Sequence, residues 1–527
     1  MIQKKIRINI LIVPLVFIIS LALFTANTLN LSHENDLIEP EFNVKTSSLD
    51  YTNATIISDG IQNIIWNDGM SRYPEIAIDS SGNLHAVWAD DTDGSWGNDS
   101  EVMYANHTSS IGWSFAKVIS DGYNNVYWND EWSGIPDIAI DSLGYIHVVW
   151  ADYTDGIWGI DSEIMYAKYT TATGWSNATV ISDGYNNAYW NNDDSSQPAI
   201  TIDNNDKIHV VFGDNSNGVW GYDSEIMYTS YTLATGWTNV SIISDGYNSI
   251  YWNDGSSWDP AIASDNIGNI HVVWEDDTNG VWGLDWEIMY AIYKEGLGWS
   301  NATIISDGIN DIYWNDGSSE NSDIAIDSSN IVHVVWDDST DGAWGSDDEI
   351  MYTNYNLPSG WAVPIVISDG YNSIFWNNGE SVDPSITVDP SGTIHVAWED
   401  DTLGIWGGGD GIDEEIMYAN YTEADGWSDA TVISDGVNGS YWNDHMSQEV
   451  SIVADANNVH VVWHDFTPGV WGVDAEIMYT SIPIPPAAGG NGISFGSFHL
   501  LFTFILILGL VIYLKKKTRK PLISTGN

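Results

Sequence analysis

The 527-residue chain contains no cysteine and few basic residues, and both shortages limit what it can be. Disulfide bonds are excluded as a source of stability, so the fold must bury enough apolar surface to hold itself together. Only 14 Lys and Arg stand against 74 Asp and Glu, which gives a formal net charge of −60. Such an acidic chain argues against nucleic acid and anionic lipid as partners, and it suits cations, cationic surfaces or neutral sugars.

Helical periodicity is also missing from residues 51–482, where the sequence instead repeats seven times. Equivalent histidines are spaced by 62 residues five times and then by 65, at His85, His147, His209, His271, His333, His395 and His460. A fixed period of this size indicates a repeat architecture. The histidine has no metal-ligand partner at fixed spacing, so we expect it to be structural and paired with the Asp of a neighbouring Asp-Ser turn.

One repeat, Pro136–Ser182, contains four short runs rich in Ile, Val, Tyr, Trp and Thr. Clusters of Gly, Asn, Asp and Ser separate these runs, which predicts four antiparallel strands per repeat. Seven such units of about 62 residues predict an all-β, seven-bladed β-propeller at 51–482. Tyr51–Ser58 resembles an isolated fourth strand, and Glu476–Ile482 a third strand with none after it. We therefore expect the N-terminal strand to complete the last blade and close the ring, which leaves no open sheet edge.

Both ends of the chain predict a membrane topology. A basic start and an apolar run are typical of a signal peptide, and the apolar stretch at 495–514 is long enough to span a bilayer. The basic residues after it place the C-terminus in the cytoplasm, and therefore the propeller outside the cell. The predicted parts are a signal peptide at 1–26, a linker at 27–50, the propeller at 51–482, a Pro/Gly linker at 483–494, a transmembrane helix at 495–514 and a cytoplasmic tail at 515–527.

Two long loops per repeat lie on one face of the predicted propeller, and loops of this kind usually carry function. The first loop always holds a Trp before Asn, at Trp66, Trp128, Trp190, Trp252, Trp314, Trp376 and Trp442. Exposed indoles can stack on sugar rings, whereas a Trp present in every blade can equally pack one loop against the next. Residues that differ between equivalent positions are better ligand candidates, namely Trp132, Trp258, Trp286, Arg72, His445 and His464.

Acidic residues also recur in these loops, and oxygen-rich loops with Gly turns can hold Ca²⁺. The candidates are Asp161 and Glu163 together with the Asp that closes each second strand, at Asp90, Asp152, Asp214, Asp276, Asp338, Asp400 and Asp465. Hydrogen bonding within the loops is the alternative role of these carboxylates. Ca²⁺ is the one cofactor that the sequence suggests.

The run Ile138–Trp150, with the degenerate turn Thr171–Trp175, resembles the repeats of sialidase-like, BNR-type propellers. That resemblance covers all seven repeats and implies the propeller fold. Sialidases use three arginines to hold a carboxylate, and the repeats contain only Arg72, so sialidase activity is not expected.

The sequence favours a membrane-anchored, extracellular propeller that recognises a glycan or protein and is a monomer without catalytic residues. A glycan-active hydrolase with the sialidase-like fold is one alternative, since two suitably placed carboxylates would suffice. A structural component of the cell envelope is the other.

Overall fold

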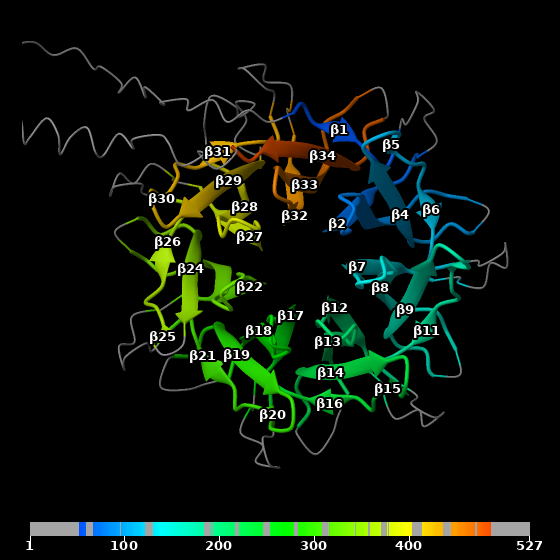
Figure 1. The fold of residues 1–527 in the computed structure, drawn as a ribbon, viewed down its shortest axis with the longest axis horizontal. Helices are drawn as coiled ribbons and strands as arrows, with labels where there is room; N and C mark the ends of the chain where they lie inside the picture. The colour runs from blue at the N-terminus through cyan, green and yellow to red at the C-terminus, as the bar shows by residue number, and fades with distance from the viewer. Residues whose placement is uncertain are drawn as a thin grey trace, which may run out of the picture. The chain divides into compact units, whose positions relative to one another are not determined.

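A computed structural model describes residues 52–485 except 60–66, 95, 122–128, 130, 157, 184–190, 192, 217–220, 246–252, 254, 279–282, 308–314, 316, 343, 357–358, 370–376, 378, 403–413, 436–442, 444 and 470–471. The described residues form seven antiparallel sheets around a common axis, which confirms the predicted all-β, seven-bladed propeller (Figure 1). No described residue lies in a helix. The signal peptide, the 27–50 linker, the 495–514 helix and the tail lie outside the described residues. Within them, no helix is long and apolar enough to cross a membrane.

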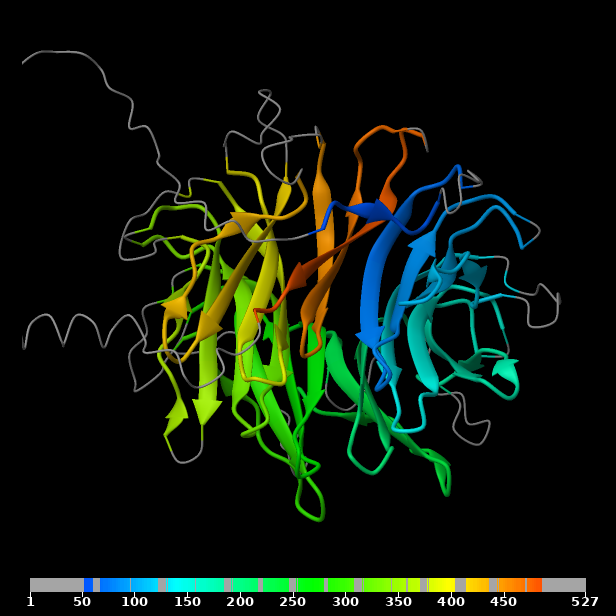
Figure 2. The same ribbon diagram turned by 45° about the horizontal axis from the view of Figure 1, so that its top comes forward.

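Each blade begins with an innermost strand, which contacts the innermost strands of both neighbouring blades around the hub (Figures 1 and 2). These strands are β2 (Ser71–Ile78), β7 (Ser133–Ile140), β12 (Ser195–Ile202), β17 (Ser257–Ser264), β22 (Ser319–Ile326), β27 (Ser381–Val388) and β32 (Ser447–Ala454). The second strands are β3 (Leu84–Asp90), β8 (Ile146–Asp152), β13 (Ile208–Asp214), β18 (Ile270–Asp276), β23 (Val332–Asp338), β28 (Ile394–Asp400) and β33 (Asn458–Asp465). The third strands are β4 (Glu101–Thr108), β9 (Glu163–Thr170), β14 (Glu225–Thr232), β19 (Glu287–Lys294), β24 (Glu349–Asn356), β29 (Glu415–Thr422) and β34 (Glu476–Pro483).

In blades one to six the outermost strand differs from the single fourth strand that the sequence predicts, because it is split in two. The first pieces are β5 (Gly112–Trp113), β10 (Gly174–Trp175), β15 (Gly236–Trp237), β20 (Gly298–Trp299), β25 (Gly360–Trp361) and β30 (Gly426–Trp427). The second pieces are β6 (Lys117–Val118), β11 (Thr179–Val180), β16 (Ser241–Ile242), β21 (Thr303–Ile304), β26 (Ile365–Val366) and β31 (Thr431–Val432). In blade two, Trp175 pairs with Tyr169 but Thr179 pairs with Tyr166, so the register slips by one residue. This slip has the form of a β-bulge, which interrupts the ladder.

Ring closure occurs as the sequence predicts. Strand β1 (Thr55–Ile56) pairs antiparallel with β34, with Thr55 opposite Tyr479 and Ile56 opposite Met478. Ile57 is fully buried and packs with apolar residues of blades one and seven. Two segments more than 400 residues apart in the sequence therefore complete one sheet.

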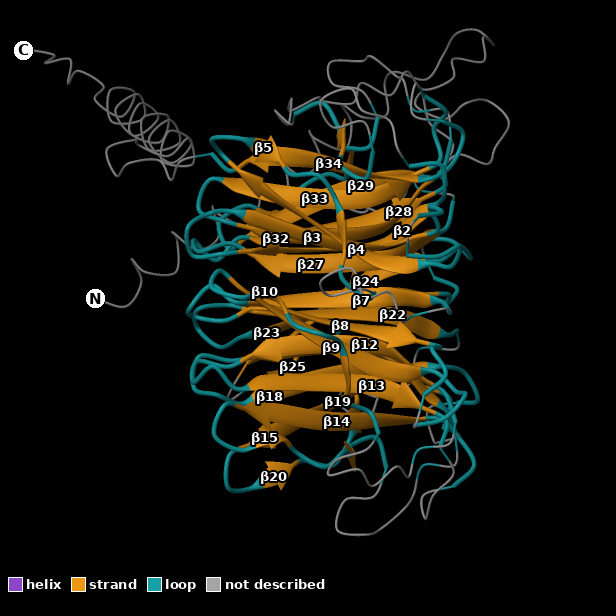
Figure 3. Ribbon diagram, turned by 90° about the vertical axis from the view of Figure 1, so that its right-hand side faces the viewer, coloured by secondary structure: helices purple, strands orange, loops and turns teal. Residues whose placement is uncertain are grey.

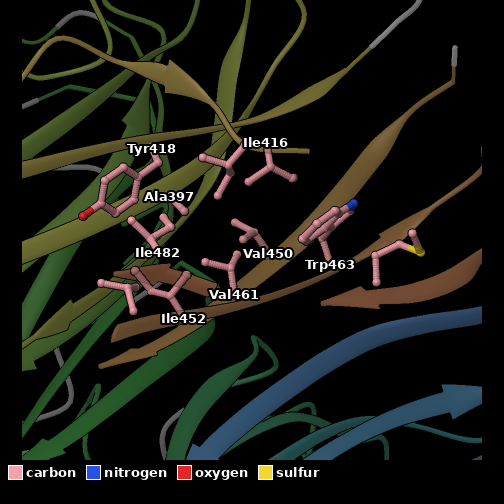
Figure 4. Packing of buried hydrophobic residues seen from close by; sticks show 11 residues of the cluster. Ala397, Ile416, Tyr418, Val450, Ile452, Val461, Trp463 and Ile482 are labelled. Atoms are coloured by element: carbon pink, nitrogen blue, oxygen red, sulfur yellow. The ribbon is translucent and has the colours of Figure 1, made fainter. Parts of the chain in front are cut away.

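Apolar side chains fill the space between neighbouring blades. Figure 4 shows the junction of blades six and seven, where Ile416 and Tyr418 face Val461 and Trp463. An aromatic residue near the end of each second strand is fully buried: Trp88, Trp150, Phe212, Trp274, Trp336, Trp398 and Trp463. Burial of such large side chains is the main source of stability that the sequence can supply without disulfides.

Candidate functional site

A hydrogen-bonded network anchors the long loops at one end of each blade. In blade two, Asp152 accepts hydrogen bonds from Ser133 Oγ at 2.9 Å, Trp150 Nε1 at 2.9 Å, Thr154 N at 2.9 Å and Asn129 Nδ2 at 3.2 Å. The same pattern recurs at the equivalents of Asp152 in the other blades, except that Asp214 lacks the indole donor because Phe212 replaces the Trp. These buried carboxylates, which the sequence marks as calcium candidates, thus already bind the ends of the loops.

Asp161 and Glu163, the other calcium candidates, lie beside this network. Ser182 Oγ donates to Glu163 Oε2, and burial raises the pKa of Glu163 to about 9, so its carboxyl group is protonated at neutral pH. Within the described residues, no group of three His, Asp or Glu side chains is arranged to hold a metal ion. Calcium binding therefore stays a prediction.

The repeated histidine is structural, as expected from the sequence. In blade two, His147 Nδ1 lies 2.8 Å from Tyr166 Oη, and its Nε2 lies 3.3 Å from Asp141 Oδ2. Burial lowers the pKa of His147 to about 4, so the ring is neutral at pH 7.

Two rings of equivalent residues surround the hub at the end of the blades that carries the long loops. The first ring is the third residue of each innermost strand, and we call it the bulge ring: Tyr73, Ile135, Gln197, Asp259, Asn321, Asp383 and Glu449. All seven have positive φ, between 44° and 55°, and each lies at a register shift between the first two strands. Left-handed backbone is costly for non-glycine residues, and above all for a β-branched one such as Ile135. Backbone strain repeated in this way commonly accompanies a functional site.

The second ring is the residue before the last Asp of each second strand, and we call it the strand-end ring: Ala89, Ala151, Gly213, Glu275, Asp337, Glu399 and His464. Side chains here are small in blades one to three and polar or charged in blades four to seven. The seven-fold symmetry of the frame is therefore broken at the mouth of the hub.

Carboxyl groups of the strand-end ring connect neighbouring blades. Glu275 Oε2 accepts a hydrogen bond from Asn321 N at 3.4 Å, and Asp337 Oδ1 accepts one from Asp383 N at 3.3 Å. Glu399 accepts in the same way from the Glu449 backbone. Each carboxyl group thus binds the strained backbone of the next blade.

A pocket of about 450 Å³ lies where this carboxyl group is replaced by a small residue. Ala151 is in its wall, and Gly213 of the next blade lies against Trp258, with room for a methyl group 3.4 Å from the ring. Its lining comes from blades two, three and four: Trp132, Ile135, Ala151, Tyr153, Ser162, Ser196, Gln197 and Trp258.

Aromatic side chains form much of the pocket wall. Trp132 and Tyr153 meet edge to face with ring centroids 5.8 Å apart, and Tyr153 N donates to Trp132 O at 3.0 Å. Gly134 lets the Trp132 ring lie close to the backbone, because a Cβ atom there would be 2.2 Å from that ring. Aromatic faces beside Ser and Gln side chains suit a ligand that is apolar on one side and hydroxylated on the other.

The carboxyl groups of blades four to six at this end of the hub have raised pKa values. Burial raises the pKa of Asp259 to about 6, with Asp383 adding to the rise, while a hydrogen bond with Gln197 lowers it. Burial, reinforced by Asp259, raises the pKa of Glu275 to about 8. Burial likewise holds the pKa of Asp337 and of Glu399 well above the usual range. Clusters of this kind are a common mark of functional sites.

Of the predicted ligand residues that the structure describes, two lie together in the pocket wall, namely Trp132 and Trp258. Trp286 lies at the junction of blades four and five, where its carbonyl oxygen accepts from Ser319 N at 2.8 Å. Arg72 forms an ion pair with Asp91 at 2.7 Å.

The two predicted histidines lie in blade seven. His464 is 3.1 Å from Glu449 and 3.3 Å from Gln448, and His445 N donates to Asn443 Oδ1 at 3.0 Å. The seven Trp of the first loop, Trp66 and its equivalents, lie outside the described residues.

Comparisons with known proteins identify no family. No family model matches the chain, and no curated protein matches it. Among solved structures, it is similar to a protein of unknown function from Dyadobacter fermentans, at 11% identity and TM-score 0.44, over 82% of this chain and 99% of the other.

Two polysaccharide lyases are also similar in structure. The polysaccharide lyase Uly1 has 12% identity and TM-score 0.48, over 83% of this chain and 94% of the other. An ulvan lyase bound to -[GlcA(1-4)Rha3S]- has 11% identity and TM-score 0.49, over 78% of this chain and 94% of the other. Likeness at this level concerns the propeller fold alone, and membership of the sialidase-like family stays a prediction.

Proposed function

We propose that the protein binds glycans in the pocket at the mouth of the hub. The observation that carries this proposal is the break in seven-fold symmetry at Ala151 and Gly213, which opens a cavity beside Trp132, Tyr153 and Trp258. Indole and phenol faces stack on sugar rings, while Ser196 and Gln197 supply polar groups that can orient hydroxyls. As part of the same proposal, the signal peptide and C-terminal helix hold this surface outside the cell.

An array of defined oligosaccharides tests the proposal, using purified full-length protein in millimolar Ca²⁺ and again with a chelator. We expect discrete hits, and at least a tenfold loss of affinity for them in Trp132→Ala and Trp258→Ala. Tyr222→Ala is the matched control, because Tyr222 is 92% exposed on a long loop and does not line the pocket. A blank array in both conditions would refute the proposal and favour an envelope role. Equal binding by all variants would refute the pocket as the glycan site. Binding that is present in Ca²⁺ and lost when the chelator is added would support the calcium prediction.

A glycan-cleaving enzyme is the second candidate, favoured by the contrast between Asp259 and Glu275. With a pKa of about 6, Asp259 is largely ionised at pH 7, whereas Glu275, at about 8, is largely protonated. A neutral acid beside an ionised carboxylate can divide the roles of general acid and base. Turnover of an array hit that is abolished in Glu275→Gln, with binding retained, would establish catalysis. Binding without turnover would exclude it for that glycan.

A further inference from the structure

Basic residues are absent from the described surroundings of the pocket. Of the Lys and Arg in the blades, Arg72 is the one at this end of the hub, and Asp91 of the same blade already pairs with it. Lys117 lies on an outermost strand, and Lys168 reaches Asp141 in the turn at the opposite end of blade two. A carboxylate, sulfate or phosphate on the ligand would therefore find no described cation as its partner.

Hydrogen-bond acceptors, in contrast, lie in the wall of the pocket and directly behind it. Gln197 lines the pocket, and its Oε1 atom is buried without a hydrogen-bond partner among the described residues. Asp259 follows Trp258 directly, interacts with Gln197 and lies within the electrostatic reach of Asp383 and Glu320. Acceptor oxygens in this arrangement favour a ligand that carries many hydrogen-bond donors.

We propose that the ligand of the pocket is an amino-sugar glycan with free amino groups, a cationic saccharide, and this inference rests on the proposed glycan binding. The sugar rings stack on Trp132 and Trp258. An ammonium group binds Gln197 Oε1 and the carboxyl group of Asp259, where burial strengthens a charge-assisted hydrogen bond. Uronic and sulfated glycans are rejected, because like charges face one another without a compensating cation.

Proton release gives the proposal a second observable. Burial raises the pKa of Asp259 to about 6, so part of the population is protonated near that pH. A bound ammonium favours the ionised carboxylate and lowers this pKa, so binding at pH 6 releases protons to the buffer. A neutral sugar in the same pocket has no such effect.

The experiment compares two probes with the same sugar backbone and linkage, the β-1,4-linked hexamers of glucosamine and of N-acetylglucosamine. They differ at the C2 nitrogen, which is an ammonium group in the first and a neutral acetamide in the second. Calorimetry at pH 6, in buffers of different ionisation enthalpy, measures affinity and proton release for the full-length protein. We expect the glucosamine hexamer to bind at least tenfold more tightly, with proton release. Asp259→Asn should remove most of this preference, because its affinity for the glucosamine hexamer falls much more than its affinity for the N-acetylated probe. Asn is compatible with the backbone there, because Asn321 holds the equivalent position in blade five with φ of 51°.

Asp155→Asn is the matched control, because it removes the same charge from an exposed site on a long loop of blade two. It should keep the preference for the amine. Equal binding of both hexamers would overturn the amino-sugar assignment while glycan binding stands. Binding of other array glycans but of neither hexamer would also overturn the amino-sugar assignment. If no glycan binds at all, both the amino-sugar assignment and the proposed glycan binding are overturned. Competition by poly-lysine that persists in Trp258→Ala would show a site for cationic protein and also refute the inference.

Discussion

Single residues at the mouth of the hub decide whether a blade junction is closed or open. Glu275 and Glu399 bind the backbone of the next blade, while Ala151 at the equivalent position leaves a cavity. The residues that recur in every blade build the propeller, and residues that differ between blades form the pocket. Tests at the residue scale should therefore change the pocket without touching the frame.

Gly134→Ala is such a change, because the new Cβ atom would lie 2.2 Å from the Trp132 ring and force that ring to move. We expect about a tenfold loss of affinity for an array-positive glycan, which corresponds to about 1.4 kcal/mol. Stability in urea should stay close to that of the parent protein. Val382→Ala, at the same strand position of blade six, should not affect binding. Unchanged binding in Gly134→Ala would mean that the position of Trp132 is not critical.

Glu163→Gln tests the buried carboxyl groups through pH. Burial raises the pKa of Glu163 from an ordinary 4.5 to about 9, so between these values the folded protein binds a proton that the unfolded chain does not. Its contribution to stability is therefore complete below pH 4.5 and is lost as the pH rises toward 9. Gln stays neutral, so urea unfolding should show the variant more stable at pH 9, by on the order of 1–3 kcal/mol, and little changed at pH 5. A variant with the pH dependence of the parent would contradict this.

Sequence comparison between repeats could predict part of the site at this scale. Trp132 and Trp258 stand out because other repeats have smaller or polar residues there, and both line the pocket. Gln197 and Asp259 do not stand out in the same way, because polar residues also occupy their position in other blades, at Asn321, Asp383 and Glu449. The strained backbone at this position is visible only in the structure. Ala151 could not be predicted for another reason. A small residue in the sequence does not show whether the space beside it is empty or filled by its neighbours.

At the scale of the strand, the sequence predicts some features correctly and misses others. The three inner strands of each blade follow from alternating β-branched and aromatic residues. The break in the outermost strand does not, because the bulge between Trp175 and Thr179 depends on pairing with β9. Ring closure by β1 was predictable from the truncated first and last repeats, and the pairing of Thr55 with Tyr479 confirms it.

Ile57→Ala tests the contribution of this closing segment. Ile57 is fully buried between blades one and seven, so its truncation leaves a cavity and should cost about 2–5 kcal/mol of unfolding free energy. Thr52→Ala, which removes a hydroxyl contact of 3.1 Å to Thr480 near the edge, should cost about 1 kcal/mol. Urea denaturation measures both. Equal small losses would mean that residues 52–58 do not hold the ring together.

At the scale of the whole molecule, an approximate seven-fold repeat builds a ring of blades, and the two ends of its hub differ. Loops and turns close the blades at both ends (Figure 3). The short turns lie at one end, and the long loops, both rings of divergent residues and the pocket lie at the other. The sequence predicted which end carries the long loops from loop lengths alone. It could not predict that blades two to four would hold the aromatic wall while blades four to six hold the carboxyl groups, because neighbouring blades meet only in the folded ring.

Net charge is the property that acts on the molecule as a whole. A formal charge of −60 opposes the compact state through self-repulsion, and in the folded protein protonation of the buried glutamates already relieves part of it. Raising NaCl from 0.1 M to 1 M shortens the screening length from about 10 Å to about 3 Å, so the melting temperature should rise by several degrees at pH 8. The rise should be smaller at pH 5, because protonation has then removed more of the charge that salt would screen. A melting temperature that stays flat or falls with salt at pH 8 would mean that buried contacts, rather than surface repulsion, set the stability of the ring.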